Sequence, residues 1–176
     1  MTPTVRLDFI RQDDQALGLQ ACVARPSFDV THAEAKATAS FTGPDGNMNM
    51  TWSPDGRWLA VGDRSDTIYL YSATEAKLAT EQKQDLETNE LAFTNNSQGL
   101  ICARGYGQVR ILSTPTLDEA YTWVANTAGL LALDVDPRGR TLAVGGHDTL
   151  ISLWDLKDLA CVKIISALEC VCLSRE

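Results

Sequence analysis

Three stretches of the sequence decide the fold: WSPDGRWLAVGDRSDTIYLY at residues 52–71, FTNNSQGLICARGYGQVRIL at 93–112 and VDPRGRTLAVGGHDTLISLW at 135–154. They align without a gap and follow one another at intervals of 41 and 42 residues. Two apolar residues, 19 positions apart, mark the ends of each stretch. These residues are Trp52 and Tyr71, Phe93 and Leu112, and Val135 and Trp154. Similar stretches at a fixed period predict one structural unit repeated along the chain.

Each repeat reads as three antiparallel β-strands. The first strand ends at the first flanking residue, and a turn follows in which Pro, Gly or Asn sets the backbone. The second strand is a short apolar run, and the third alternates so that one of its faces enters a core. Second strands are predicted at 58–61, 100–103 and 141–144, and third strands at 68–71, 109–112 and 151–154. Each following linker (72–83, 113–123 and 155–165) has room for a fourth strand, which predicts an all-β fold.

A period of 41 or 42 residues with four strands resembles the WD40 repeat, whose units are the blades of a β-propeller. The Trp-Asp dipeptide of that family is intact at Trp154-Asp155 and is replaced in the other two copies. The family's Gly-His pair is absent, and its structural Asp, six residues before the Trp, is present only as Asp148. The His-Asp-Ser-Trp hydrogen-bond network of the family is therefore expected to be incomplete in every blade. Apolar packing between neighbouring blades is then expected to carry more of the stability.

The repeats are expected to occupy residues 28–165, between an off-pattern segment at 1–27 and an off-pattern tail at 166–176. Phe28 is predicted to end a strand of a partial blade, and residues 37–41 to form the outer strand of that blade. The expected units are a partial blade at 28–47 and blades at about 48–83, 84–124 and 125–165.

Closed propellers have about 4–8 blades, so three blades and a remnant predict an open arc of a propeller of about seven blades. The terminal blades of such an arc are expected to expose apolar faces and strand edges. A truncated product, a misjoined product and a genuine short form all fit this pattern.

The repeats are also similar to those of a narrower family, the WD-repeat subunits of THO complexes. The stretch DTLISLWDLKDLACV at 148–162 carries this resemblance, together with an Asn-rich turn and Ile-Leu-Ser-x-Pro in the middle copy. The resemblance implies a non-enzymatic scaffold in the nucleus, within the THO/TREX assembly that couples transcription to messenger-RNA processing and export. Its partners would be other subunits of that assembly. The alternative is a WD scaffold of an unrelated nuclear or cytoplasmic complex, such as an adaptor of a ubiquitin ligase or a chromatin modifier.

The composition is that of an ordinary globular protein, with 44% hydrophobic and 22% charged residues. No run approaches the ~18–20 apolar residues of a membrane span, and residues 1–10 lack the apolar core of a signal peptide. The sequence therefore predicts a soluble intracellular protein with no membrane partner. A net charge of −8 also disfavours direct nucleic-acid binding, which depends on clustered Lys and Arg.

Five cysteines and two histidines offer no metal or cofactor site. The cysteine count is odd and there is no Cys-x-x-Cys motif, so neither disulfides nor a zinc site are expected. Cys102 and Cys161 lie in apolar runs and are predicted to be small buried side chains.

No catalytic set is found in the sequence. His147-Asp148 has no Ser or Cys nucleophile placed with it, and Gly105-Tyr106-Gly107 lacks the Lys-Ser/Thr ending of a phosphate loop. A propeller hydrolase would need such a clustered set.

The residue before the structural-Asp position is Arg64, Gly105 or His147, in a turn that the WD40 resemblance places on a partner-binding face. Arg64 and His147, with Arg104 beside them, are therefore the candidate partner contacts. The alternative interpretation is that these side chains are solvated loop charges.

Overall fold

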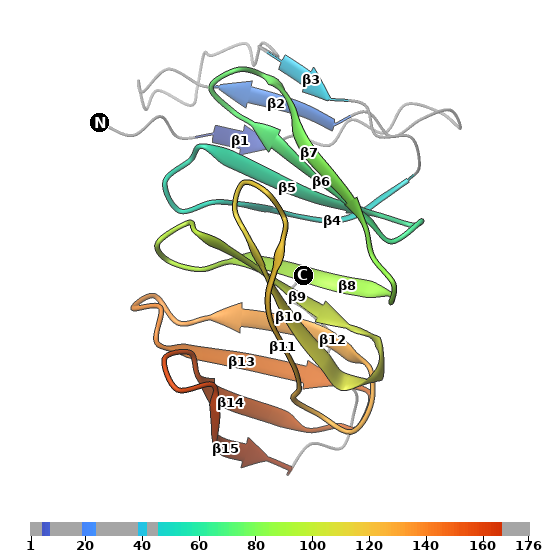
Figure 1. Cartoon of the computed structure of the whole chain (residues 1–176), viewed down its shortest axis with the longest axis vertical. Helices are drawn as coiled ribbons and strands as arrows, with labels where there is room; N and C mark the ends of the chain where they lie inside the picture. Colours follow the sequence, from blue (N-terminus) through green and yellow to red (C-terminus); the bar gives the residue numbers. More distant parts are fainter. Residues whose placement is uncertain (1–4, 8–18, 24–38, 42–45, 167–176) are drawn as a thin grey trace, which may run out of the picture.

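The computed structural model describes residues 5–7, 19–23, 39–41 and 46–166, which form antiparallel sheets stacked along the long axis of the molecule (Figure 1). Three of the sheets have four strands each, and we name them the first, second and third sheet in chain order. The first sheet contains β4 (Asn47–Trp52), β5 (Trp58–Asp63), β6 (Thr67–Ser72) and β7 (Lys77–Lys83). The second contains β8 (Thr88–Phe93), β9 (Gly99–Arg104), β10 (Gln108–Ser113) and β11 (Glu119–Val124). The third contains β12 (Leu130–Val135), β13 (Thr141–Gly146), β14 (Ile151–Asp155) and β15 (Ala160–Ile165).

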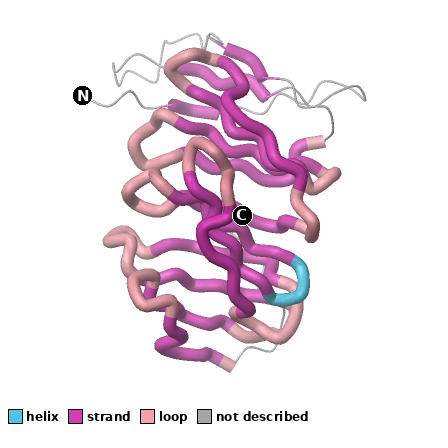
Figure 2. The backbone as a smooth tube through the Cα atoms, viewed as in Figure 1, coloured by secondary structure: helices cyan, strands magenta, loops and turns pink. Residues whose placement is uncertain are grey.

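The all-β prediction is confirmed, because strands and turns make up nearly all of the described chain (Figure 2). The helical exception among the described residues is one short 3-10 turn at Gly105–Gly107. First strands end at the predicted flanking residues Trp52, Phe93 and Val135, and the linkers form the fourth strands β7, β11 and β15. In each sheet the four strands are neighbours in sequence order, which short turns between antiparallel strands allow.

A smaller sheet of three strands lies beside the first sheet, at the opposite end of the stack from the third sheet (Figure 1). Its strands are β1 (Val5–Leu7), β2 (Leu19–Val23) and β3 (Ala39–Phe41), in that order. β1 and β2 come from the segment at 1–27 that the repeat pattern leaves out, and β3 lies in the outer strand predicted at 37–41. Phe28 and residues 167–176 of the tail lie outside the described residues.

The backbone turns repeat with the same 41- and 42-residue intervals as the sequence. Gly56, Ser97 and Gly139 each have a φ between 60° and 70°, and each donates its N–H to a carbonyl three residues earlier at 2.8 Å. Glycine adopts this left-handed conformation without a steric penalty, and Ser97 takes the same conformation in the second sheet. Ser97 also accepts the Asp55 N–H of the first sheet at 3.1 Å, which joins two consecutive turns.

Two apolar layers hold the three sheets together. The layer between the first and second sheets is centred on Ile68, Leu70, Phe93, Leu100 and Leu112. The layer between the second and third sheets is centred on Ile101, Val109, Leu130, Leu142 and Val144. Strand β9 supplies both layers because successive side chains of a strand point to opposite faces. Fully burying a side chain of this size stabilises the fold by about 1.5–3 kcal/mol, so these layers supply much of the cohesion of the stack.

Candidate interaction site

The three turns that the sequence analysis singled out lie at equivalent places in consecutive sheets. The N–H groups of Arg64, Gly105 and His147 donate to the carbonyls of residues 46, 87 and 129, at 3.0, 2.9 and 3.0 Å. These bonds tie each turn to the connection that enters the same sheet. We call this end of the sheets the Tyr106 end, after the residue at the tip of the middle turn. The side chains of Arg64 and His147 are exposed there.

Arg104 lies elsewhere, in the interior, with an exposed fraction of 0%. Its Nη2 pairs with Asp85 Oδ1, and its Nη1 donates to Gln108 Oε1 at 3.1 Å. Its Nε is buried and has no hydrogen-bond partner among the described residues. Arg104 therefore offers no surface to a partner protein in this conformation, and its bonds fix the connection that holds Asp85.

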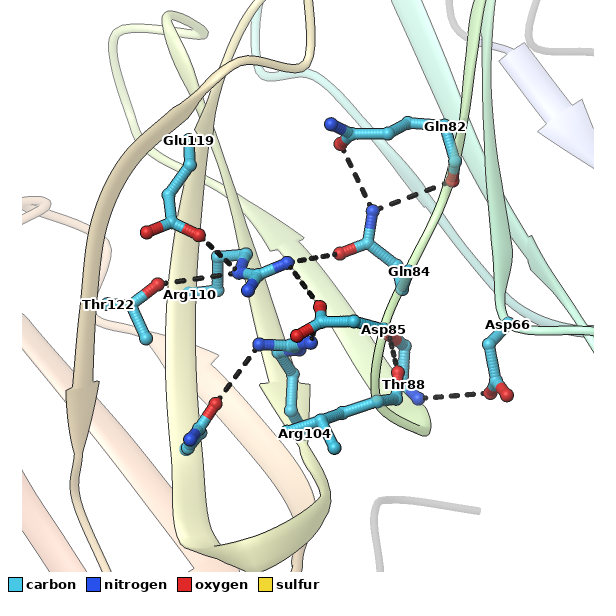
Figure 3. Close-up of polar contacts among 11 residues, drawn as sticks. Asp66, Gln82, Gln84, Asp85, Thr88, Arg104, Arg110, Glu119 and Thr122 are labelled. Atoms are coloured by element: carbon cyan, nitrogen blue, oxygen red, sulfur yellow. Dashed lines mark hydrogen bonds and ion pairs between the residues drawn. The ribbon is translucent and has the colours of Figure 1, made fainter.

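Arg104 belongs to a polar cluster that spans the first and second sheets (Figure 3). The centre of the cluster is Arg110, whose Nη1 donates to Asp85 Oδ1 at 2.8 Å and to Gln84 Oε1 at 3.1 Å. Its Nε lies 2.8 Å from Glu119 Oε2. Burial on its own would raise the pKa of Asp85, but its own backbone N–H, the Arg110 hydrogen bond and the two arginine charges hold that pKa below its usual value. Asp85 is therefore a partly exposed carboxylate that pairs with the guanidinium groups of both Arg104 and Arg110.

The third sheet contains a different network at the corresponding positions. Trp154 Nε1 donates to Ser152 Oγ at 2.8 Å, and Ser152 Oγ donates to Asn126 Oδ1 at 2.6 Å. Asn126 Nδ2 then donates to Asp148 Oδ1 at 3.2 Å. The histidine of the family network is absent, but the Asn126 amide accepts and donates in its place. The third sheet therefore lacks the family's complete His-Asp-Ser-Trp network, as the sequence predicts, but Asn126 gives it an unbroken chain of hydrogen bonds from Trp154 to Asp148.

In the first sheet, a third polar network is centred on Asp63. The Tyr69 hydroxyl donates to Asp63 Oδ2 at 3.1 Å, and Asp63 Oδ1 accepts the N–H groups of Ser65 and Thr67, each at 2.9 Å. Burial on its own would raise the pKa of Asp63, but the hydrogen bonds from Thr67, Ser65 and Tyr69 lower it. Tyr69 thus occupies, in the first sheet, the repeat position that Arg110 occupies in the second sheet, 41 residues later. Tyr69 and Arg110 were not predicted as network residues because their residue types differ from the serine of the family pattern. The repeat spacing alone would have placed both at the same position as Ser152.

Tyr106 forms the tip of the middle turn and is 77% exposed. Its φ is 55° and its ψ is 27°, and Gly107 has a φ of 73°. The Gln108 N–H donates to Gly105 O and closes the turn. Two central residues with positive φ make this a type I′ turn, which normally takes Asn, Asp or Gly at the position of Tyr106.

The two described free cysteines have opposite surroundings. Cys102 is buried between the first two sheets, and burial raises the pKa of its thiol to about 12. Cys161 is exposed on the outer strand β15, so the prediction that it is buried was wrong. The reason is that outer strands present both faces and one edge to solvent, even where their sequence is apolar.

His147 and Asp148 do not pair with each other. The Asp148 carboxylate is bound instead by Asn126 and by the backbone and hydroxyl of Thr127. Over the described ranges, no group of three His, Cys, Asp or Glu residues could hold a metal ion. In the same part of the chain no helix has the length and apolar character that crossing a membrane requires.

The family model for the WD domain, G-beta repeat, matches residues 35–72 and 118–155. The second match runs from β11 through β14, which is the outer strand of one sheet and three strands of the next. The chain belongs to the WD40-repeat family. Its three four-stranded sheets are blades of the WD40 type, and proteins of this family are generally scaffolds without enzymatic activity.

Individual relatives agree with this family membership. The WD40 chain is 37% identical over 123 residues to THO complex subunit 3 of Arabidopsis thaliana, a match that covers 70% of this chain and 39% of that protein. It is 30% identical over 123 residues to WD repeat-containing protein AAC3 of Dictyostelium discoideum, covering 66% of this chain and 26% of that protein. The crystal structure of the RRP9 WD40 repeats superimposes with a TM-score of 0.65 at 11% identity, over 71% of this chain and 40% of that one. The WD40 chain thus spans well under half the length of these relatives.

Proposed function

We propose that this WD40 chain is a protein-interaction scaffold of a THO/TREX assembly, acting in the nucleus in transcription-coupled messenger-RNA processing and export. The observation that carries the proposal is the 37% identity to THO complex subunit 3 of Arabidopsis thaliana over 70% of the chain. The partners are other protein subunits of that assembly. The net charge of −8 supports protein rather than nucleic-acid partners, because a phosphate backbone is bound by clustered positive charge.

The Tyr106 end is the surface we assign to partner binding. Arg64, Tyr106 and His147 project from three consecutive sheets at this end, and all three side chains are exposed. Among the described residues, no hydrogen bond or ion pair is made by the side chains of Arg64 or His147. Exposed side chains that the fold does not use are available to a partner, and they sit on turns that rigid strands position.

Affinity purification of the tagged chain from cells, followed by mass spectrometry, tests this function. The proposal predicts recovery of the other THO subunits. Recovery of ubiquitin-ligase or chromatin-modifier subunits in their place would favour the alternative of an unrelated WD scaffold. A fluorescent fusion of the same chain is expected to accumulate in the nucleus, and exclusion from the nucleus would contradict the proposal.

A further inference from the structure

Tyr106 is one of seven described non-glycine residues with a left-handed φ, and it is the most exposed of the three that have a large side chain, the others being Leu117 and Leu159. A left-handed backbone conformation costs free energy for any residue with a Cβ atom, and bulky residues rarely adopt it. At the same repeat position, Ser65 bonds the Asp63 carboxylate of its own turn, and Asp148 binds Asn126 and Thr127. Tyr106 makes no hydrogen bond among the described residues and leaves most of its ring in solvent. A strained, exposed aromatic residue that does nothing for its own turn indicates a role outside the chain.

The charge that lies beside this turn is negative. Gly105, next to Tyr106, donates its N–H to the backbone oxygen of Glu87 at 2.9 Å. A Cβ atom on Gly105 would lie 3.8 Å from the Glu87 Cβ, so the two residues are neighbours. Glu87 is exposed, and its carboxylate has no ion pair or hydrogen bond in the described part of the chain. The nearby positive charge of Arg104 is buried and already paired with Asp85.

Gly129 and His147 lie on the other flank of Tyr106. A Cβ atom on Gly129 would lie 3.8 Å from Tyr106 N and 3.6 Å from His147 Cδ2, so only a glycine separates the two turns. Arg64 belongs to the first sheet, where its side chain runs along Gly46, with its Nε 3.4 Å from a Cβ built there. The surface around Tyr106 therefore combines an exposed aromatic ring, the free Glu87 carboxylate and the neighbouring Gly129 and His147.

We propose that Tyr106 and Glu87 form a binding site for an arginine side chain of a partner protein. This inference rests on the proposed function as a protein-interaction scaffold and names the partner chemistry. A guanidinium stacks on the tyrosine ring by a cation–π interaction while its N–H fork donates to the Glu87 carboxylate. Arginine suits this pair better than lysine because its planar group can stack and donate at the same time. The net charge of −8 favours approach of a basic segment.

The test is a titration of the isotope-labelled chain with the peptide acetyl-Gly-Arg-Gly-amide, followed by NMR. The proposal predicts saturable shifts of the amide signals of Gly105, Tyr106 and Gly107, and no such shifts with acetyl-Gly-Glu-Gly-amide. Loss of the cation–π contact in Tyr106→Gly is expected to weaken binding about two- to fivefold, and Tyr106→Phe is expected to retain it. Glu87→Gln is expected to weaken binding as well. Tyr121→Ser removes another exposed tyrosine, on β11, and serves as the matched control.

Tyr106→Gly separates binding from folding, since glycine relieves the left-handed conformation. The melting temperature is expected to rise in this variant while the affinity for the arginine peptide falls. Equal shifts with the two peptides, no shifts with either, or unchanged affinity in Tyr106→Gly would overturn the arginine site.

The two proposals fail in different experiments. If THO subunits co-purify but the arginine peptide does not bind, the arginine site fails and the proposed function stands. If the peptide binds as expected but no THO subunit co-purifies, the proposed function fails and the arginine site stands.

Discussion

Arg110 and Ser152 occupy the same position of consecutive repeats, 42 residues apart, and make the same contact. Arg110 Nη1 donates to Gln84 Oε1 at 3.1 Å, and Ser152 Oγ donates to Asn126 Oδ1 at 2.6 Å. Gln84 and Asn126 are themselves 42 residues apart. In both sheets a side-chain amide on the incoming connection is therefore bound by the third strand. The repeat preserves the place of this contact while the donor changes from a hydroxyl to a guanidinium.

Removing the Asn126 amide is expected to destabilise the third sheet. Asn126→Ala would leave the buried Ser152 hydroxyl without its acceptor and would remove a hydrogen bond to Asp148. Leaving such buried groups unpaired costs about 1–3 kcal/mol, measurable as a lower urea midpoint. Asn96→Ala is the control, because Asn96 is exposed and bonds only within its own turn. Equal midpoints for the two variants would contradict the role given to Asn126.

Replacing Asp85 is expected to destabilise the fold more than replacing Arg104, its ion-pair partner. Asp85→Asn would leave the buried Arg104 charge without its carboxylate, at a cost of about 1–3 kcal/mol. This figure is reduced from that of a fully buried pair because Asp85 is 67% exposed. Arg104→Met removes the charge and keeps most of the side-chain volume, so its cost is expected to be smaller. Thermal unfolding of both variants gives the order, and a larger loss in Arg104→Met would contradict it.

Two glycines with nearly the same φ are expected to differ in their tolerance of alanine. Gly56 has a φ of 70°, and a Cβ there would have no atom within 4 Å. Gly107 has a φ of 73°, and its Cβ would lie 2.0 Å from Asn126 O. Gly56→Ala is expected to cost about 1–2 kcal/mol from backbone strain alone. Gly107→Ala must also move a backbone and is expected to cost about 3 kcal/mol or more. Equal losses of unfolding free energy would show that this close approach is absent.

Acid is expected to weaken the fold through aspartates bound in its turns. Burial on its own would raise the pKa of Asp55, but hydrogen bonds from Ser53 and Arg57 lower it from 3.8 to about 2. The pKa values of Asp63 and Asp148 are lowered as well. A carboxyl group whose pKa is lower in the folded chain than in the unfolded chain stabilises the fold at a pH above its unfolded-state pKa. This stabilisation is lost as the pH falls through the folded-state pKa. The urea midpoint should therefore fall between about pH 4 and pH 2, and less steeply in Asp55→Asn. A midpoint that is flat over this range would contradict the assignment.

The thiols of Cys161 and Cys102 are expected to react at different stages of unfolding. Cys161 is exposed in the native state, whereas Cys102 is buried with a pKa raised to about 12. A thiol reagent should modify Cys161 in the folded chain and Cys102 only after denaturant is added. Comparing Cys161→Ser and Cys102→Ser by mass spectrometry assigns each modification. Native modification of Cys102 would show that the layer between the first two sheets is not closed.

The strands could be predicted from the sequence because they depend on period and alternation, which any residue of the right polarity satisfies. Trp52, Phe93 and Val135 differ in type but all end a first strand. The polar networks could not be predicted, because each depends on which partner happens to lie across from a given position. Nothing local to Arg104 indicates that its side chain will be buried and paired with Asp85, and the exposure of Cys161 depends on its place in an outer strand.

The most direct test of the scaffold function compares THO-subunit recovery by two charge-reversal variants of the chain. Arg64→Glu reverses an exposed charge at the Tyr106 end. Arg138→Glu reverses an exposed charge on the turn that joins β12 to β13, at the other end of the sheets. Arg64→Glu is expected to reduce the recovery of THO subunits, with no change in melting temperature, while Arg138→Glu leaves recovery at the wild-type level. No THO subunits with the wild-type chain would contradict the proposed scaffold, and full recovery with Arg64→Glu would contradict the assignment of the Tyr106 end as its binding surface.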